Sequence, residues 1–204
     1  MLTLTEFFTL VPTAQTVYVR AFQETGIAVF TAFEITTKLR LTHFLAQVVH
    51  ESGGLAYLTE NLNYRTAARL MTVWPKRFPT LESAQPYVMN PRALANKIYG
   101  GRNGNLNATD GYTYRGRGLI QITGRANYQR ATDILAVDFI NQPELVITPE
   151  HALWVAGAAW TWLRGNEAAD LDDIRLVTFR INGGYNGIDD RKAWMDLIEK
   201  SVNV

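Results

Sequence analysis

Two glutamates in contrasting surroundings are the side chains of this chain best suited to acid–base chemistry. Glu51 ends an apolar segment with helical spacing, and Glu60 lies nine residues further on in a polar segment. Apolar surroundings disfavour the charged form of a carboxyl group, which suits a general acid, whereas a solvated carboxylate suits a base. Two carboxyl groups in such different settings meet the requirement for cleaving a glycosidic bond.

The element that must position Glu51 is a short helix. Apolar residues repeat at helical spacing over residues 41–49, which predicts an amphipathic helix from about Thr42. At about 100° per residue, Glu51 falls at the edge of the apolar stripe, and the two glycines that follow end the helix. His50 lies roughly opposite the stripe, so we expect it to meet solvent or a hydrogen-bonding partner.

Helical patterns dominate the rest of the chain and predict a mainly α fold. Further helices are expected at about residues 7–24, 28–38, 66–73, 91–99, 149–163, 174–181 and 191–201. The helix at 149–163 is rich in small residues and tryptophan, so Trp154, Trp160 and Trp162 are expected in the core. Residues 62–96 carry more turn signals and are expected to form a smaller lobe.

One region, from Gly100 to Gly118, breaks the helical pattern and predicts a long loop or a small hairpin. Tyr112 and Tyr114 lie in this region. Their flat, amphipathic rings are candidates for stacking on sugars, with core packing as the alternative.

Residues 119–123 follow this region and are expected to be extended. In an extended segment alternate side chains share a face. Ile120 and Ile122 would then anchor in the core, while Gln121 and Thr123 would face a cleft.

The composition is that of a globular chain without a strong overall charge. The 204 residues are 47% hydrophobic and 19% charged, with a net charge of +1, which predicts one domain with a sizeable core. The low net charge gives no support to nucleic-acid binding. The chain has no cysteine, which excludes disulfides and thiolate metal sites.

The sequence predicts neither secretion nor membrane insertion. The longest uncharged apolar run, near residues 152–163, is too short to span a bilayer. The first charged side chain after Met1 is the acidic Glu6, so we expect no secretory signal and synthesis in the cytoplasm.

Neither a metal nor a cofactor is expected. A zinc-protease helix that contained His50 and Glu51 would need a second histidine at position 54, where the chain has glycine. The other histidines, His43 and His151, form no ligand cluster in the sequence. The segment Gly116–Gly118 lacks the third glycine and the distal acid of a dinucleotide-binding loop.

Four segments, taken together and in this order, resemble glycoside hydrolase family 19, most closely its bacteriophage endolysin branch. They are His50–Gly54, Glu60–Tyr64, Tyr114–Gly124 and Ile181–Gly184. The resemblance implies a lysozyme-like helical fold of two lobes around a cleft. It also implies inverting hydrolysis of a β-1,4 bond between N-acetylated sugars.

The resemblance assigns roles by position. Glu51 matches the general acid, Glu60 the general base, and Thr123 a hydroxyl that helps to hold the attacking water. Arg191 matches a late arginine near the acid–base network. The full set of expected substrate-binding residues is Tyr112, Tyr114, Arg115, Gln121, Asn127, Tyr128, Asn182 and Arg191.

The resulting interpretation is a phage or prophage endolysin of the muramidase type that cleaves peptidoglycan glycan strands. Residues 1–204 are expected to form a single catalytic domain without a wall-binding module, to act as a monomer, and to reach the wall through a membrane lesion made by another protein. A chitinase, a lytic transglycosylase and an inactive sugar-binding module are the alternatives. The short spacing between the two glutamates and the lack of cysteine favour a wall-lysing enzyme over a plant-type chitinase.

Overall fold

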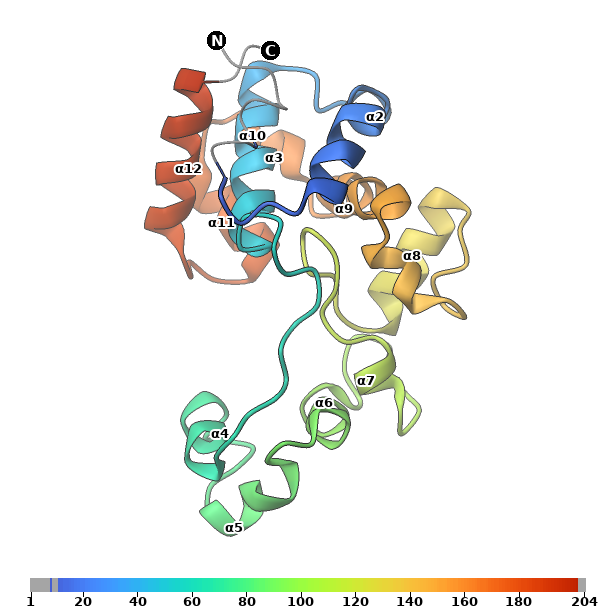
Figure 1. The fold of residues 1–204 in the computed structure, drawn as a ribbon, viewed down its shortest axis with the longest axis vertical. Coiled ribbons are helices and arrows are strands. Elements are labelled where there is room, and N and C mark those ends of the chain that lie inside the picture. The colour runs from blue at the N-terminus through green and yellow to red at the C-terminus, as the bar shows by residue number, and fades with distance from the viewer. Residues whose placement is uncertain (1–7, 9–10, 202–204) are drawn as a thin grey trace.

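The structure, a computed structural model, describes residue 8 and residues 11–201, and it is mainly helical with two lobes, as predicted (Figure 1). The start of the helix predicted at residues 7–24 lies outside the described residues. In chain order the elements are α2 (Thr16–Ala32), α3 (Lys38–Glu51), α4 (Ala67–Val73), α5 (Leu81–Ala84), the 3-10 helix η1 (Gln85–Tyr87), α6 (Pro91–Tyr99), α7 (Asp110–Thr113), α8 (Arg125–Leu135), the 3-10 helix η2 (Pro143–Ile147), α9 (Pro149–Trp162), α10 (Gly165–Ala169), α11 (Ile174–Asn182) and α12 (Ile188–Ser201).

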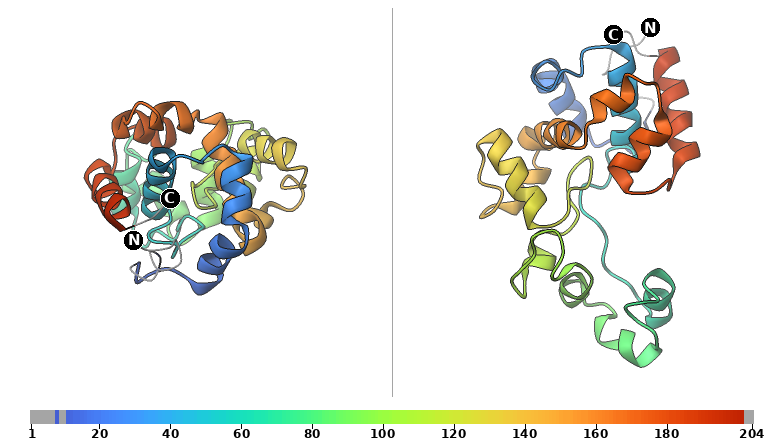
Figure 2. Two further views of the ribbon diagram at one scale, coloured as in Figure 1. Left: turned by 90° about the horizontal axis from the view of Figure 1, so that it is seen from above. Right: turned by 180° about the vertical axis from the view of Figure 1, so that it is seen from behind.

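Helix α3 is the centre of the larger lobe. It runs between α2 and α12 in the views of Figure 1 and Figure 2, and α10 and α11 also pack against it. Every residue from Leu41 to Val49 is buried, so the helix is enclosed on all sides and has no open polar face over this stretch. The amphipathic helix predicted here is therefore a core helix, which begins at Lys38 with Thr37 as its N-cap.

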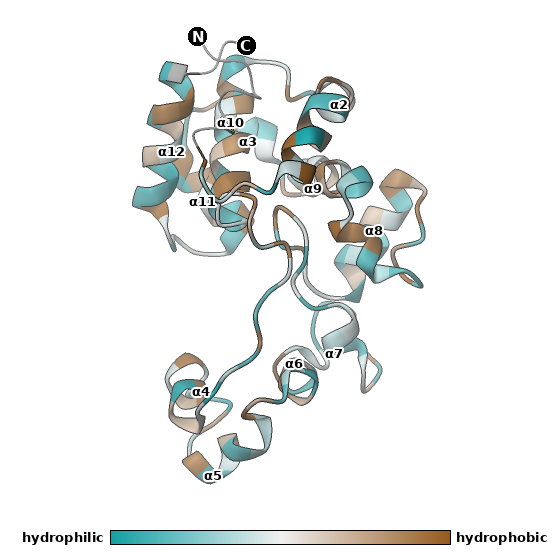
Figure 3. Cartoon of the chain, in the orientation of Figure 1, coloured by the Kyte–Doolittle hydropathy of each residue, from teal (hydrophilic) through white to brown (hydrophobic). Residues whose placement is uncertain are grey.

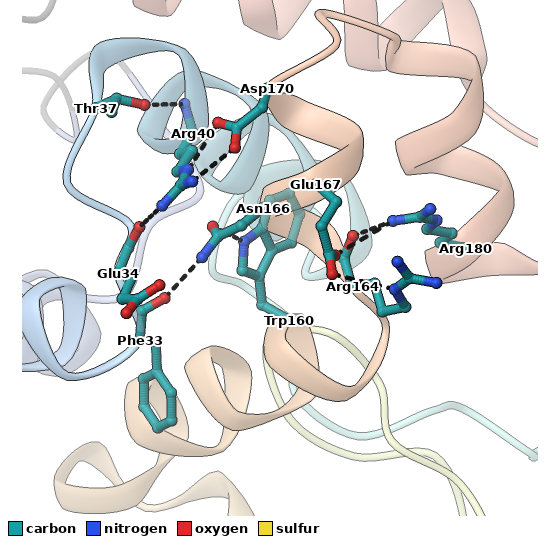
Figure 4. Close-up of polar contacts among 10 residues, drawn as sticks. All are labelled: Phe33, Glu34, Thr37, Arg40, Trp160, Arg164, Asn166, Glu167, Asp170 and Arg180. Atoms are coloured by element: carbon teal, nitrogen blue, oxygen red, sulfur yellow. Dashed lines mark hydrogen bonds and ion pairs between the residues drawn. The ribbon is translucent and has the colours of Figure 1, made fainter.

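A polar network fixes the beginning of α3 to its neighbours (Figure 4). The guanidinium of Arg40 forms an ion pair with Asp170, at 2.6 Å, in the turn that ends α10. Asn166 accepts a hydrogen bond from the indole of buried Trp160 at 2.7 Å and donates to the carbonyl of Phe33 at 2.9 Å. The ends of α2 and α9 are thus held against α10, and α3 is fixed at the end opposite to Glu51.

The smaller lobe has its own hydrophobic core. Its buried residues lie between Leu62 and Ile98, with Tyr99 and Tyr112 packed against them. Helix α7 packs on α6, and Gly111 permits this contact because a Cβ there would stand 2.6 Å from the carbonyl oxygen of Ala95. The segment that leads from the larger lobe to α4 is mostly hydrophilic (Figure 3).

Several predicted helices match the structure closely, and others do not. The predictions at 66–73, 91–99, 149–163 and 174–181 each agree to within one residue at either end. The predicted pair at 7–24 and 28–38 is wrong: α2 continues through Gly26, because a single glycine inside a helix costs only about 1 kcal/mol. Helix α8 was not predicted. Trp160 is fully buried, and Trp154 and Trp162 pack against the same core, as expected.

Candidate active site

A short antiparallel pairing between the lobes positions Glu60. The backbone N–H of Glu60 donates to the carbonyl of Gly116 at 3.0 Å, and that of Gly118 donates to the carbonyl of Leu58 at 2.8 Å. Arg117, between the two glycines, forms β-bridges with both Thr59 and Ile122. The segment leaving the larger lobe is thereby fastened to the segment that returns to it (Figure 1).

The carboxylate of Glu60 is held by two hydrogen bonds. Its Oε2 accepts from the hydroxyl of Tyr99 at 2.6 Å, and its Oε1 accepts from the backbone N–H of Gly116 at 2.5 Å. Burial, together with the charge of Glu60, raises the pKa of Tyr99, so its phenol keeps the proton that it donates. The solvated setting expected for Glu60 is in fact a half-buried one with fixed donors.

Thr123 lies next to Glu60, with Gly116 between them. A Cβ on Gly116 would stand 3.2 Å from the hydroxyl oxygen of Thr123 and 3.3 Å from Oε1 of Glu60. The hydroxyl and the carboxylate oxygen are therefore within 6.5 Å of each other, and only glycine leaves the space between them open. Asn127 donates from its side chain to the carbonyl of Thr123 at 3.0 Å and so fixes its backbone.

Glu51 is the last residue of α3, and its side chain is 15% exposed. Its Oε1 accepts a hydrogen bond from the guanidinium of Arg191 in α12. The side chain of Arg191 is fully buried. The same guanidinium contacts Gln47, one turn earlier on α3, and donates to the carbonyl of Asn186 at 3.3 Å. The apolar surroundings expected for Glu51 are thus only part of its environment, because a buried cation touches its carboxylate.

Helix α12 also holds the residue before Glu51. Nδ1 of His50 lies 2.6 Å from a carboxylate oxygen of Asp190, so His50 is a hydrogen-bonding residue, as predicted. Gly187, with φ of +71°, brings the chain so close to His50 that a Cβ there would overlap the imidazole ring. Contacts from one helix therefore orient both His50 and Glu51.

Two of the tyrosines expected to bind substrate are core residues instead. Tyr114 is 5% exposed, packs against Tyr128 with ring centroids 5.2 Å apart, and donates its hydroxyl to the carbonyl of Ile140 at 3.1 Å. Tyr128 is fully buried; its hydroxyl accepts from Arg117 at 2.9 Å and donates to the carbonyl of Arg115 at 2.8 Å. Because their hydroxyl groups find partners inside the protein, both rings are buried and neither can stack on a sugar.

The remaining expected contact residues lie in different settings. Tyr112 is half-buried with the guanidinium of Arg115 4.2 Å from its ring centre, and both line a hollow of about 190 Å³ that Glu60 also lines. Asn182 is exposed at the end of α11. Gln121 is half-buried with φ of +41° in a turn, so the extended segment predicted at residues 119–123 is wrong.

The isoleucines of that turn are buried as expected, and Leu119 is buried as well. A second hollow, of about 170 Å³, is lined by Tyr99 and Thr123 together with Arg102, Asn103 and Asn105. Two larger hollows, of about 390 and 410 Å³, lie between α2 and α9 and between α8 and α9, and neither is lined by Glu51 or Glu60.

Sequence reasoning missed three residues that hold the site. Tyr99 binds Glu60, and Gln47 contacts Arg191. Arg117 is fully buried and ties together the carbonyl of Thr113, at 2.7 Å, and the carboxylate of Glu144, at 2.5 Å. The one available signal was the position of Arg117 between Gly116 and Gly118. Glycines allow another segment to approach the backbone closely, and the arginine between them is enclosed.

The described residues show no feature of a metal centre or a membrane span. Across residue 8 and residues 11–201, no three His, Cys, Asp or Glu side chains lie close enough together to hold a metal ion. None of the helices in this part of the chain is both long enough and apolar enough to cross a bilayer.

Sequence comparisons match a family model and several named relatives. The family Glyco_hydro_19, described as chitinase class I, matches residues 76–173, a segment that includes Thr123 but neither glutamate. A Haemophilus influenzae protein called glycosyl hydrolase family 19 domain-containing protein is 44% identical over 156 residues, 76% of each chain. Chitinase 8 of Oryza sativa is 37% identical over 71 residues, 34% of this chain and 27% of the rice protein.

Solved structures share the fold. Chitinase C from Streptomyces griseus HUT6037 superposes with a TM-score of 0.59 and 22% identity over 96% of this chain and 75% of the chitinase chain. A bacterial family 19 chitinase gives a TM-score of 0.57 and 22% identity over 96% of this chain and 93% of its own. The lysozyme-like architecture expected from the sequence is therefore the one observed.

Proposed function

Because this chain belongs to glycosyl hydrolase family 19, we propose that it hydrolyses β-1,4 glycosidic bonds of bacterial peptidoglycan, with Glu51 as general acid and Glu60 as general base. One observation carries the proposal: two carboxyl groups are held in different ways. Glu51 accepts a hydrogen bond from the buried guanidinium of Arg191. Glu60 accepts hydrogen bonds from the hydroxyl of Tyr99 and the backbone N–H of Gly116, and it lies beside Thr123. Fixed donors contact both carboxylates, so the division into acid and base follows the positions of the two glutamates in the motifs that resemble the family.

The contacts suggest which atoms act. Arg191 occupies Oε1 of Glu51, so the proton given to the departing sugar oxygen comes from Oε2. Glu60 takes a proton from water, whose oxygen bonds to the anomeric carbon as the bond to the leaving oxygen breaks. The hydroxyl of Thr123 is the second group proposed to hold this water, since Gly116 separates it from the Glu60 carboxylate and leaves that space open. Tyr99 and Gly116 keep the Glu60 carboxylate in one orientation.

The proposed biological role is that of a phage endolysin. It rests on the order of the motifs around Glu51, Glu60 and Thr123, which resembles the endolysin branch of the family. In this role the protein is made in the cytoplasm of the host and acts in the periplasm as a monomer, after another protein has permeabilised the membrane. Chitin is the second candidate substrate, because several of the similar proteins are named chitinases.

The test is mass spectrometry of fragments from purified peptidoglycan and, in parallel, from soluble chitin oligosaccharides. We expect muropeptides that have gained one water at a reducing sugar, at a higher turnover than the chitin fragments. Fragments with anhydro-sugar ends would show that the reaction is that of a lytic transglycosylase and not hydrolysis. Cleavage of chitin alone would assign the chain to the chitinases, and binding without cleavage would assign it to sugar-binding modules.

A further inference from the structure

The segment that contains the smaller lobe is far more basic than the rest of the chain, which the net charge of +1 conceals. Residues 62–118 contain nine of the twenty Lys and Arg residues but only two of the nineteen Asp and Glu residues, a formal charge of +7. The rest of the chain therefore carries −6. A strongly basic lobe attracts anionic ligands and raises their local concentration, whereas an uncharged polysaccharide gains nothing from it.

The two acidic residues of this segment do not neutralise its charge where the lobes meet. Asp110 is buried, and its carboxylate accepts hydrogen bonds from the backbone of Leu106 and Asn107. Glu82 lies in the first turn of α5. Glu144, from the larger lobe, forms ion pairs with Arg117 at 2.5 Å and with Arg115 at 3.8 Å, and so offsets part of this charge.

Two arginines of the basic lobe converge on one aromatic ring beside Glu60. The guanidinium carbons of Arg115 and Arg92 stand 4.2 Å and 5.2 Å from the centre of the Tyr112 ring. Arg115 is fixed further by a hydrogen bond of 2.9 Å to the carbonyl of Tyr112. Arg92 is exposed at the start of α6. Stacking on an aromatic face restricts a guanidinium while leaving N–H groups at its edge for a ligand.

The Tyr112 ring lines two hollows. One, of about 190 Å³, is lined by Arg115 and Glu60 among others, and the second, of about 220 Å³, is lined by Arg92, Thr109 and Thr113 as well as Tyr112. A glycan seated against Glu60 therefore passes a ring that carries two cations. The planar fork of a guanidinium group matches the geometry of a carboxylate, through two parallel N–H···O bonds.

We propose that Arg92 and Arg115, held on Tyr112, form a subsite for a carboxylate attached to the glycan. The inference rests on the proposed function and specifies its substrate class as an acidic glycan. Peptidoglycan fits this class because its peptides, linked to the lactyl groups of alternate sugars, carry free carboxylates. Chitin has none.

The test compares Arg92→Gln, Arg115→Gln and the double variant on two forms of one substrate. The first form is native peptidoglycan, and the second is the same material with its carboxyl groups chemically amidated. We expect the preference of the wild type for the native form, measured as the ratio of the kcat/KM values, to fall about tenfold in the double variant, as the loss of hydrogen bonds to a charged group implies. Tyr112→Ala should lower the same ratio, because it removes the support of both arginines.

Arg77→Gln is the matched control, since Arg77 is an exposed arginine of the same lobe that lines neither hollow. An equal fall in the ratio for Arg77→Gln would overturn the subsite in favour of a diffuse charge effect. An unchanged ratio in the double variant, with peptidoglycan still cleaved by the wild type, would overturn the subsite and leave the proposed function intact. A wild-type enzyme that cleaves only neutral chitin oligosaccharides would overturn the proposed substrate itself.

Discussion

Glu51 is the residue on which the proposed chemistry depends most. Glu51→Gln keeps the side-chain volume and an oxygen that can accept from Arg191, but its amide has no acidic proton to give to the leaving group. We expect turnover to fall by about 10² to 10⁴, the usual contribution of a general acid. The assay is the loss of turbidity of permeabilised cells, with circular dichroism as the folding control.

Glu82→Gln makes the same chemical change at an exposed position in α5 and should leave turnover unchanged. A folded Glu51→Gln protein that retained more than roughly a tenth of wild-type activity would remove Glu51 from the role of acid.

Tyr99 is expected to act through Glu60. Tyr99→Phe removes the hydroxyl that donates to Oε2 at 2.6 Å, while Gly116 still donates to Oε1. A hydrogen bond to a charged group contributes about 1.5–3 kcal/mol, so we expect kcat to fall by about tenfold or more with little change in KM. Steady-state kinetics and the pH profile of kcat measure the effect.

Tyr114→Phe is the control for Tyr99→Phe, because it also removes a tyrosine hydroxyl that donates to an acceptor inside the protein, the carbonyl of Ile140. It should lower the melting temperature without lowering kcat. If both variants lost kcat equally, the contact between Tyr99 and Glu60 would have no special role.

At the residue scale, the sequence predicted which side chains are candidates for the acid–base chemistry, but it did not predict which residues surround them. Glu60 and its partner Tyr99 are 39 positions apart, and no local pattern connects them. Tyr112 and Tyr114 look equivalent in a loop, where residues two apart share a face. A helical turn at α7 separates residues two apart by about 200°. Tyr112 therefore lines a hollow, whereas Tyr114 is buried in the core.

At the scale of elements, helices with clear end signals were predicted well. Helix α6 has Asn90 as N-cap and Pro91 in its first turn, and Gly100 follows its last residue. Where such signals were weak, tertiary packing decided: α2 passes through Gly26, and the turn at Gln121 adopts a positive φ that alternation of side chains does not reveal. The pairing of residues 58–60 with 116–118 joins segments too distant for any periodicity to indicate.

The contact between the start of α12 and the end of α3 gives a prediction for two glycines with the same backbone angle. Gly187 and Gly183 both have φ of +71°, but only a Cβ on Gly187 would overlap His50, whose ring is fixed by Asp190. Alanine at either position costs about 1–2 kcal/mol for the left-handed conformation. Gly187→Ala should cost about 1–3 kcal/mol more, from overpacking.

Thermal unfolding measures this difference. For a chain of this size, each kcal/mol lowers the melting temperature by about 2–4 °C, so Gly187→Ala should melt several degrees below Gly183→Ala. Equal melting temperatures of the two variants would mean that His50 at the end of α3 can move to make room for the added Cβ, so that α12 does not fix its position.

At the scale of the whole molecule, stability should depend on pH through His43. This histidine is fully buried in α3, with Nε2 3.0 Å from Asp172 and Nδ1 without a partner among the described residues. Burial lowers the pKa of His43, although Asp172, Glu199 and Asp173 oppose the shift. Below about pH 6.5 the unfolded chain binds a proton that the folded chain resists, so stability is lost as the pH falls toward the folded pKa.

The loss from one such group is at most about 1.4 kcal/mol per pH unit. We expect His43→Gln to flatten the fall in melting temperature between pH 7 and pH 5, whereas His151→Gln, which leaves the His43–Asp172 pair intact, should keep the wild-type slope. Identical slopes in wild type and His43→Gln would show that other groups govern the acid sensitivity of the fold.

The stereochemistry of the first product tests the central claim, hydrolysis by an acid and a base on opposite sides of the sugar. A base that activates water needs a separation of about 6.5–9.5 Å between the two carboxyl groups, whereas a nucleophile stands at about 5–5.5 Å. The measurement is proton NMR of a short soluble peptidoglycan oligosaccharide during the first turnovers, before mutarotation. We predict a newly formed α reducing end from the β linkage. A β product would contradict the account, because Glu60 would then not be a base acting on water.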